Sequence, residues 1–373
     1  MSLPVPVNTP LLNGKEKKYL NECVDTGWIS SEGTFITRFE SEFSNYCGRG
    51  HGIAVSSGSA ALDIAVKALG ISIGDEVIMP TFTIISPALS VIKAGGIPVY
   101  IDNEPDSWNM DTALIEAKIT TKTRAILVVH IYGLPTRMDI VIALAQKYDL
   151  LVIEDAAEMH GQTFDGKMCG SFGDVSIFSF YANKNITTGE GGMVLCDDAD
   201  IARRCKKFRN LAFEVDKPRF VHYESGWNYR MTNLQAAMGV AQLEQIDQFI
   251  ARKRLMGAYY QHELSFLTKY GYQLPLQKTT YADNIYWVFG LMAPNESEKE
   301  KLVAYLNSNK IGTRPFFWCM HEQPLFAETN SSTKDSYPIS ERQARCGFYI
   351  PSGLGLTTGQ MTTVVKVIQK MYA

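Results

Sequence analysis

The sequence predicts an α/β protein that has a large domain and a smaller α+β domain. From about residue 50 to residue 245, short apolar runs alternate with turns and with helical segments. Because the connections are long enough to hold helices, we expect a mostly parallel sheet of roughly seven strands. The 373 residues are 46% hydrophobic and 20% charged, which suits a substantial core. We therefore assign residues 1–245 to the large domain, with its N-terminal segment, and residues 246–373 to the small C-terminal domain.

The predicted elements of the large domain follow one another in a regular order. Strands are expected at 51–56, within 73–80, and at 97–101, 125–129, 150–153, 174–180 and 192–196. Helices are expected at 60–69, 83–94 and 138–148. A helical run from 233 to about 264 would link the two domains. The small domain would contain apolar segments around 286–291 and helices at 299–307 and 359–372.

Composition excludes several classes of protein. The net charge is −3 and basic residues are scattered, so nothing favours a nucleic-acid partner. Seven cysteines are widely spaced and include no Cys-x-x-Cys pair, which argues against a disulfide framework and favours a reducing cytoplasm. No signal segment or membrane span is expected. The six histidines show no metal-ligand spacing, so we expect no metal site.

Lys184 is the leading candidate for a chemical centre. It lies between an apolar strand that ends near Phe180 and a glycine-rich turn, and a second apolar strand ends at Glu154 and Asp155. A lysine amine can hold the aldehyde of pyridoxal phosphate as a Schiff base, and a carboxylate keeps the ring nitrogen of that cofactor protonated. Taken singly, Lys184 could lie on a solvated face and Asp155 could simply cap a helix.

Other polar residues are expected at the same edge of the sheet, because ligands of open α/β sheets bind beyond the carboxyl ends of the strands. Ser57, Gly58 and Ser59 join a strand to a helix, and their amides and hydroxyls could hold a phosphate. Ser179 could donate a further hydrogen bond, and Phe82 could stack on a flat ring. The alternatives are a plain helix cap for the serine turn, a satisfied core hydroxyl for Ser179, and a core position for Phe82.

Six separated motifs, in this order, resemble those of one family, the nucleotide-sugar aminotransferases of the DegT/DnrJ/EryC1/StrS family. They lie at residues 57–62, 74–78, 154–158, 173–180, 184–192 and 228–232. The resemblance runs nearly end to end. It implies the fold-type I aminotransferase architecture and a homodimer in which both subunits build each site. It also implies pyridoxal 5′-phosphate, with pyridoxamine 5′-phosphate as its intermediate form, and L-glutamate as the amino donor.

The resemblance also implies roles for single residues. Lys184 would bond covalently to the cofactor, Asp155 would hold the pyridine nitrogen, and Phe82 would stack on the ring. The other implied cofactor contacts are Ser57, Gly58, Ser59, Ser179, Glu158 near the ring hydroxyl, and Asn228 from the other subunit. Candidate contacts of the sugar nucleotide are Trp28, Ser30, Arg230 and His321. In the dehydratase branch of this fold a histidine stands in place of the lysine, so Lys184 argues for amine transfer; a non-catalytic sensor is a further alternative.

Three further stretches bear on the substrate. Residues 26–31, 189–193 and 314–321 resemble members that transfer the amine to C4 of GDP-4-keto-6-deoxy-D-mannose, a step in the synthesis of surface polysaccharides such as the O-antigen of lipopolysaccharide. UDP- and dTDP-linked keto sugars remain alternatives. The chain departs from common family patterns at Ser59, where relatives often have threonine, and at Tyr181 and Ala182. The first change keeps the hydroxyl, whereas the second lies near the expected substrate.

Overall fold

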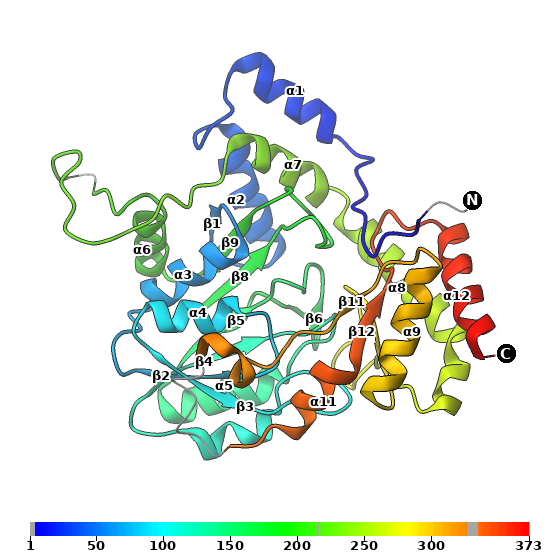
Figure 1. The fold of residues 1–373 in the computed structure, drawn as a ribbon. Coiled ribbons are helices and arrows are strands. Elements are labelled where there is room, and N and C mark those ends of the chain that lie inside the picture. Colours follow the sequence, from blue (N-terminus) through cyan, green and yellow to red (C-terminus); the bar gives the residue numbers. More distant parts are fainter. Residues whose placement is uncertain (1–3, 215, 327–334, 373) are drawn as a thin grey trace.

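The computed structural model describes residues 4–214, 216–326 and 335–372, and its largest element is a seven-stranded sheet (Figure 1). β9 pairs antiparallel with β1 and β8, and the other neighbouring strands of this sheet are parallel. This confirms the predicted sheet. In spatial order the strands are β1 (His51–Val55), β9 (Gly192–Cys196), β8 (Val175–Ser179), β5 (Leu151–Asp155), β4 (Thr123–Val129), β2 (Glu76–Pro80) and β3 (Ile97–Ile101).

Helices cover both faces of the sheet and form a three-layer domain. Because side chains alternate along a strand, Ile177 of β8 is buried in one layer and its neighbour Phe178 in the other. The layer of Ile177 contains α3 (Gly58–Ala68), α4 (Ser86–Lys93) and α6 (Ala199–Arg209). The layer of Phe178 contains α2 (Thr34–Tyr46), α5 (Met138–Tyr148) and α7 (Asn233–Leu243), and α1 (Glu16–Thr26) packs on α7. A small hairpin pairs β6 (Thr163–Phe164) with β7 (Lys167–Met168).

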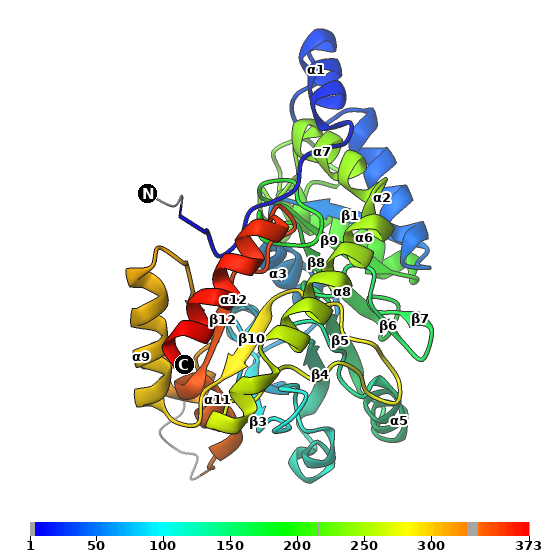
Figure 2. The same ribbon diagram turned by 90° about the vertical axis from the view of Figure 1, so that its right-hand side faces the viewer.

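The C-terminal part has a core of its own around a second sheet (Figure 2). This sheet is antiparallel and consists of β10 (Phe289–Met292), β12 (Gly347–Ile350) and β11 (Arg314–Pro315). Its helices are α8 (Ile246–Glu263), α9 (Glu296–Ser308), α11 (Pro338–Cys346) and α12 (Thr358–Tyr372). Val5 joins the same core, so the N-terminal segment reaches the small domain. The boundary between residues 245 and 246 stays a prediction.

The structure corrects one prediction about a helix. The run from 233 to 264 is two helices, because the backbone at Gln245 (φ −116°, ψ 5°) leaves helical geometry between α7 and α8. Glu244 at this break accepts a hydrogen bond from the hydroxyl of Tyr19 (2.7 Å) and forms ion pairs with Lys15 and Arg38. These contacts join segments that are far apart in the chain, so local periodicity did not reveal them.

Two further findings concern membrane spans and cysteines. Among the helices of the described residues, none combines the length and the apolar run that a bilayer crossing requires. All seven cysteines are buried as free thiols.

Candidate active site

Lys184 and Asp155 meet at the carboxyl edge of the large sheet, as predicted. Asp155 is the last residue of β5, and Ser179 is the last residue of the neighbouring strand β8. The chain turns after β8, where the Lys184 amide donates a hydrogen bond to the carbonyl of Tyr181 (2.9 Å). Parallel neighbours therefore deliver an acid and an amine to one place.

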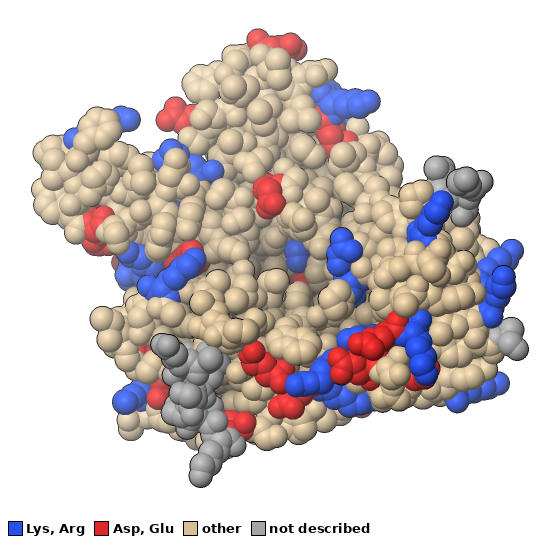
Figure 3. Space-filling model, in the orientation of Figure 1, with Lys and Arg blue, Asp and Glu red and all other residues tan. Residues whose placement is uncertain are grey.

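The amine of Lys184 is enclosed by protein. Its side chain is 10% exposed, and Nζ lies 4.0 Å from Oε1 of Glu158 and 3.9 Å from the ring centroid of Trp287. Burial lowers the pKa of Lys184, and the negative charges of Glu158 and Asp155 oppose that shift. In Figure 3 this face of the molecule is hollowed near its middle, and both basic and acidic atoms are visible at the base of the hollow.

Glu158 is the nearest acid to the lysine amine. Its Oε2 accepts a hydrogen bond from the backbone amide of Tyr132 (2.7 Å), which fixes the carboxylate in place. Burial raises the pKa of Glu158 to about 8, against the opposing effect of Lys184. The pKa values of the acid and the amine are therefore shifted toward each other, which is typical of sites where side chains take up and release protons.

Asp155 is 2% exposed. Its Oδ1 accepts the backbone amide of Ala157 (3.1 Å), so it also caps the turn after β5. Burial raises the pKa of Asp155 to about 6, while the Ala157 amide and the charge of Lys184 act in the opposite direction. A cation beside this carboxyl would keep it ionised, which is the arrangement that a protonated ring nitrogen needs.

The start of α3 forms an anion cradle with the ends of β8 and β9. Ser57 caps α3 by accepting the amide of Ala60 (3.1 Å). A Cβ on Gly58 would lie 2.9 Å from Cβ of Ser179, and one on Gly192 would collide with the carbonyl of Ser57. The backbone thus approaches closely only because both positions are glycine. Hydroxyls and the N-terminal amides of an 11-residue helix converge here, which suits a phosphate.

Two predicted cofactor contacts lie near this edge in different settings. Ser59 is exposed, and its hydroxyl shares a hydrogen bond with Ser86 at the start of α4 (2.7 Å). Phe82 is fully buried, and its ring packs edge-on against Tyr132 and Phe317. The buried ring has the core role that composition left open, and stacking of Phe82 on a cofactor stays a prediction.

The candidate substrate residues are spread over the surface. The ring of His321 lies beside the end of β2, where Nδ1 is 2.7 Å from the hydroxyl of Thr81. Arg230 lies at the end of β1 and donates to Ser31 (3.1 Å). Asn228, Trp28 and Ser30 are exposed. Among the described residues, no hydrogen bond or ion pair joins Asn228, Trp28, Ser30 or Arg230 to Lys184, so their roles stay predictions.

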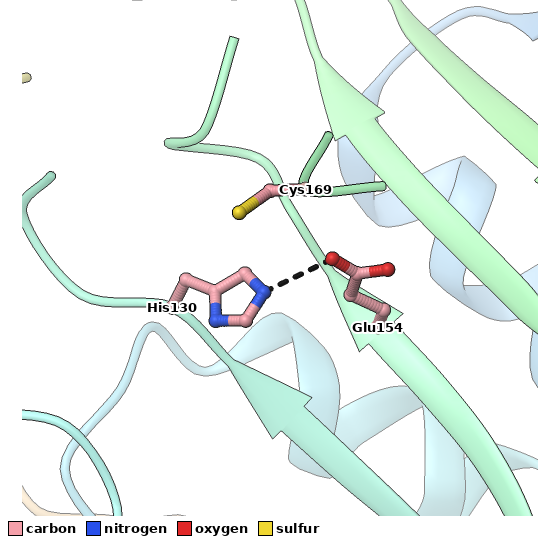
Figure 4. Close-up of side chains that lie close together, drawn as sticks. All are labelled: His130, Glu154 and Cys169. Carbon is pink, nitrogen blue, oxygen red and sulfur yellow. Dashed lines mark hydrogen bonds and ion pairs between the residues drawn. The ribbon is translucent and has the colours of Figure 1, made fainter. Parts of the chain in front are cut away.

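A second buried cluster supports the end of β5 (Figure 4). Nδ1 of His130 accepts the backbone amide of Thr136 (3.1 Å), so Nε2 carries the proton and donates to Glu154 (3.1 Å). The two oxygens of Glu154 also accept the amides of Gly170 and Phe172. Cys169 completes a group with metal-ligating spacing, but both nitrogens of His130 already have partners. The cluster is therefore a hydrogen-bonded group that holds Glu154, and with it the end of β5 next to Asp155, in place.

Sequence patterns missed two residues that enclose Lys184. The ring face of Trp287 contacts the amine of Lys184. Its indole NH donates a hydrogen bond to the carbonyl of Asn183, which is 104 residues earlier in the chain (2.9 Å). Tyr132 holds Glu158 and stacks on Trp287 at 6.1 Å between ring centroids. Both residues stand in apolar runs that resemble ordinary core, so only the folded chain reveals their position.

Comparison with known proteins agrees with this geometry. The profile of the DegT/DnrJ/EryC1/StrS aminotransferase family matches residues 10–369. GDP-perosamine synthase of Escherichia coli O157:H7 is 40% identical and that of Vibrio cholerae is 38% identical, each alignment covering 99% of both chains. The structure is similar to that of NtdA from Bacillus subtilis with bound pyridoxamine phosphate (TM-score 0.87, 27% identity, covering 95% of this chain and 81% of that chain).

The raised pKa of Asp155 predicts a stability difference that depends on pH. With a pKa of about 6 in the folded chain and 3.8 in the unfolded chain, the cofactor-free protein is destabilised as pH rises through this interval. We expect Asp155→Asn to have a higher free energy of unfolding than the wild type at pH 8, by about 1–3 kcal/mol, and to lose that advantage toward pH 4.

Urea unfolding at several pH values measures this difference, and the exposed Asp149→Asn serves as the matched control. The same Asp155 variant should bind pyridoxal phosphate more weakly, since the ring nitrogen loses its anion. An unchanged or opposite pH trend would show that Asp155 is not a strained buried carboxylate.

Proposed function

The chain belongs to the DegT/DnrJ/EryC1/StrS aminotransferase family, and on that premise we propose that it moves an amino group from L-glutamate to C4 of GDP-4-keto-6-deoxy-D-mannose to form GDP-perosamine. It is a pyridoxal phosphate-dependent aminotransferase with the fold-type I architecture. The observation that carries the proposal is the enclosed amine of Lys184 beside two buried acids and an anion cradle. The choice of sugar nucleotide is supported by the full-length relatives at 38–40% identity.

The residues at the carboxyl edge fit pyridoxal phosphate. Lys184 would bond to its aldehyde carbon and Asp155 would pair with its ring nitrogen, while Ser57, Ser179 and the amides of α3 would hold its phosphate. When bound, the cofactor supplies an electron-accepting ring and carries the amino group between donor and acceptor. Each of these contacts matches a side chain whose chemistry the cofactor requires.

The proton is moved by side chains of this protein, Lys184 and Glu158. The lowered pKa of Lys184 favours its unprotonated amine, which can take up a proton, and the negative charge of Glu158, whose Oε1 lies 4.0 Å from Nζ, stabilises the ammonium that results. Since the backbone amide of Tyr132 fixes the Glu158 carboxylate, this acid stays beside the amine while Lys184 takes up and releases the proton. The enclosed amine is what separates amine transfer from the dehydratase and sensor alternatives.

Lys184→Ala should lower turnover by roughly 10³-fold or more, because the variant has no amine to hold the cofactor or move the proton. Steady-state kinetics with L-glutamate and the keto sugar nucleotide measure this effect. The exposed Lys301→Ala is the matched control and should keep its activity. Normal turnover in the Lys184 variant would refute the assignment of the site.

The substrate can be tested with the pyridoxamine phosphate form of the enzyme. We expect GDP-4-keto-6-deoxy-D-mannose to restore the visible absorbance of pyridoxal phosphate, and UDP- and dTDP-linked 4-keto sugars to react at least about tenfold more slowly. Stopped-flow absorbance with each sugar at equal concentration gives the comparison. If a UDP- or dTDP-linked sugar reacts fastest, the choice of GDP is wrong, although the aminotransferase assignment stands.

We further propose that two copies of the chain build each site, and that they act in the cytoplasm, where the seven free thiols stay reduced. Residues 211–214 and 216–225 extend away from the body (Figure 1), and Phe220 (73%) and Tyr223 (62%) are exposed there. Trp28 and Ile29 are also about half exposed. Apolar side chains of this size on an extended arm support burial against a second subunit, with Asn228 beside the arm reaching the partner's cofactor.

Shared sites predict complementation between two inactive variants. A mixed dimer of Lys184→Ala and Asn228→Glu has one site with both native residues, so refolding an equal mixture should restore about a quarter of the sites. Activity before and after mixing, together with light scattering for the mass, measures this. Two variants that stay inactive after subunit exchange, or a monomeric mass, would contradict the shared site.

A further inference from the structure

Trp287 forms one wall around the amine of Lys184. Its ring centroid lies 3.9 Å from Nζ, and Glu158 lies 4.0 Å from the same atom. The indole is 3% exposed, so no solvent layer separates the ring from the ammonium. A cation that lies over an indole face is attracted by the negative face of the ring, and this attraction is stronger where water is excluded.

The protein holds Trp287 at both ends. Its indole NH donates to the carbonyl of Asn183, the residue directly before Lys184 (2.9 Å). Its own carbonyl accepts a hydrogen bond from Nζ of Lys253 (2.9 Å), which also donates to the carbonyl of Ser352. Lys253 is 2% exposed, and burial lowers its pKa to about 7. Burying a lysine whose amine donates to two backbone carbonyls costs free energy, and its effect here is to anchor Trp287 beside Lys184.

The backbone around Trp287 is strained. Tyr286 directly before it has φ 50°, and Tyr132, which stacks on the indole, has φ 58°. Residues other than glycine seldom adopt positive φ angles, and such backbone strain is concentrated at functional sites. A Cβ on Gly133 would lie 2.7 Å from the amide of Tyr286, so the two strained segments are in direct contact.

We propose that Trp287 is a catalytic residue whose ring face binds the ammonium form of Lys184 and keeps the amine beside Glu158 while the proton moves. The proposal deepens, and rests on, the aminotransferase function given above. The groups that act on the amine are Glu158 and Asp155, which favour its charge, and the neutral His160, whose own charged form Lys184 disfavours. Trp287 adds to the two acids, so without the indole the pKa of Lys184 falls further.

The test is the pH dependence of labelling at Lys184 in the full-length chain. Competitive acetylation of the cofactor-free protein, followed by mass spectrometry of the peptide that contains Lys184, gives the pKa of this amine. We expect Trp287→Leu to lower that pKa by about 0.5–1.5 units and Trp287→Phe, which keeps a ring face, to lower it less. The same order should hold for kcat, with the optimum of the pH profile shifted toward acid.

If Trp287→Leu fails to fold, a second experiment tests the same role of the indole. Replacing tryptophan with mono-, di- and trifluorinated tryptophan preserves shape but weakens the negative ring face stepwise, so the pKa of Lys184 should fall stepwise. Trp227→Leu removes an indole that lies 5.1 Å from Lys67, and it should leave the labelling of Lys184 unchanged. Equal labelling curves for all Trp287 replacements would overturn the proposal.

The labelling result and the proposed function can fail separately. Labelling of Lys184 needs no cofactor, so a shift in the leucine variant supports the role of Trp287 even if pyridoxal phosphate does not bind. Conversely, a leucine variant that binds the cofactor and transfers the amine normally, with an unchanged pKa of Lys184, would leave the aminotransferase assignment standing and refute the role of Trp287.

Discussion

The rest of the site depends on the burial of one lysine amine at the carboxyl edge of the sheet. Burial disfavours the charged forms of Lys184, Glu158 and Asp155. It therefore lowers the pKa of the amine and raises the pKa values of the two acids. Their mutual attraction offsets part of that cost and requires them to stay close. The amide of Tyr132, which donates to Glu158, and the ring of Trp287, which lies against the amine of Lys184, hold this arrangement.

The strand order of the sheet brings these groups together. β5 and β8 are parallel neighbours, so Asp155 and the segment of Lys184 emerge at the same edge, and α3 begins there after β1. Gly58 and Gly192 let three backbone segments approach closely enough to form an anion cradle. The His130–Glu154 pair closes the far side of β5 with hydrogen bonds that hold the strand end in place.

Much of this could be predicted from sequence because the signals are local. The strand at 97–101, the helix at 138–148 and the strand at 192–196 coincide with β3, α5 and β9, since their apolar patterns are regular and their ends carry turn residues. Lys184, Asp155 and Ser57 were identifiable because each follows a predicted strand. Trp287 and Tyr132 were not, because their function lies in contacts with distant residues. The break between α7 and α8 was missed for the same reason, as Glu244 contacts the N-terminal helices.

We propose that Lys184 is the amine that holds the cofactor, and covalent trapping of the cofactor on its lysine tests this assignment. Borohydride reduction of the protein loaded with pyridoxal phosphate fixes the cofactor to the lysine that binds it, and peptide mapping by mass spectrometry locates that lysine. We expect a single phosphopyridoxyl label on Lys184 in the wild type and no specific label in Lys184→Ala. A stoichiometric label on another lysine, such as the buried Lys253, or a loaded protein with no reducible bond, would contradict it.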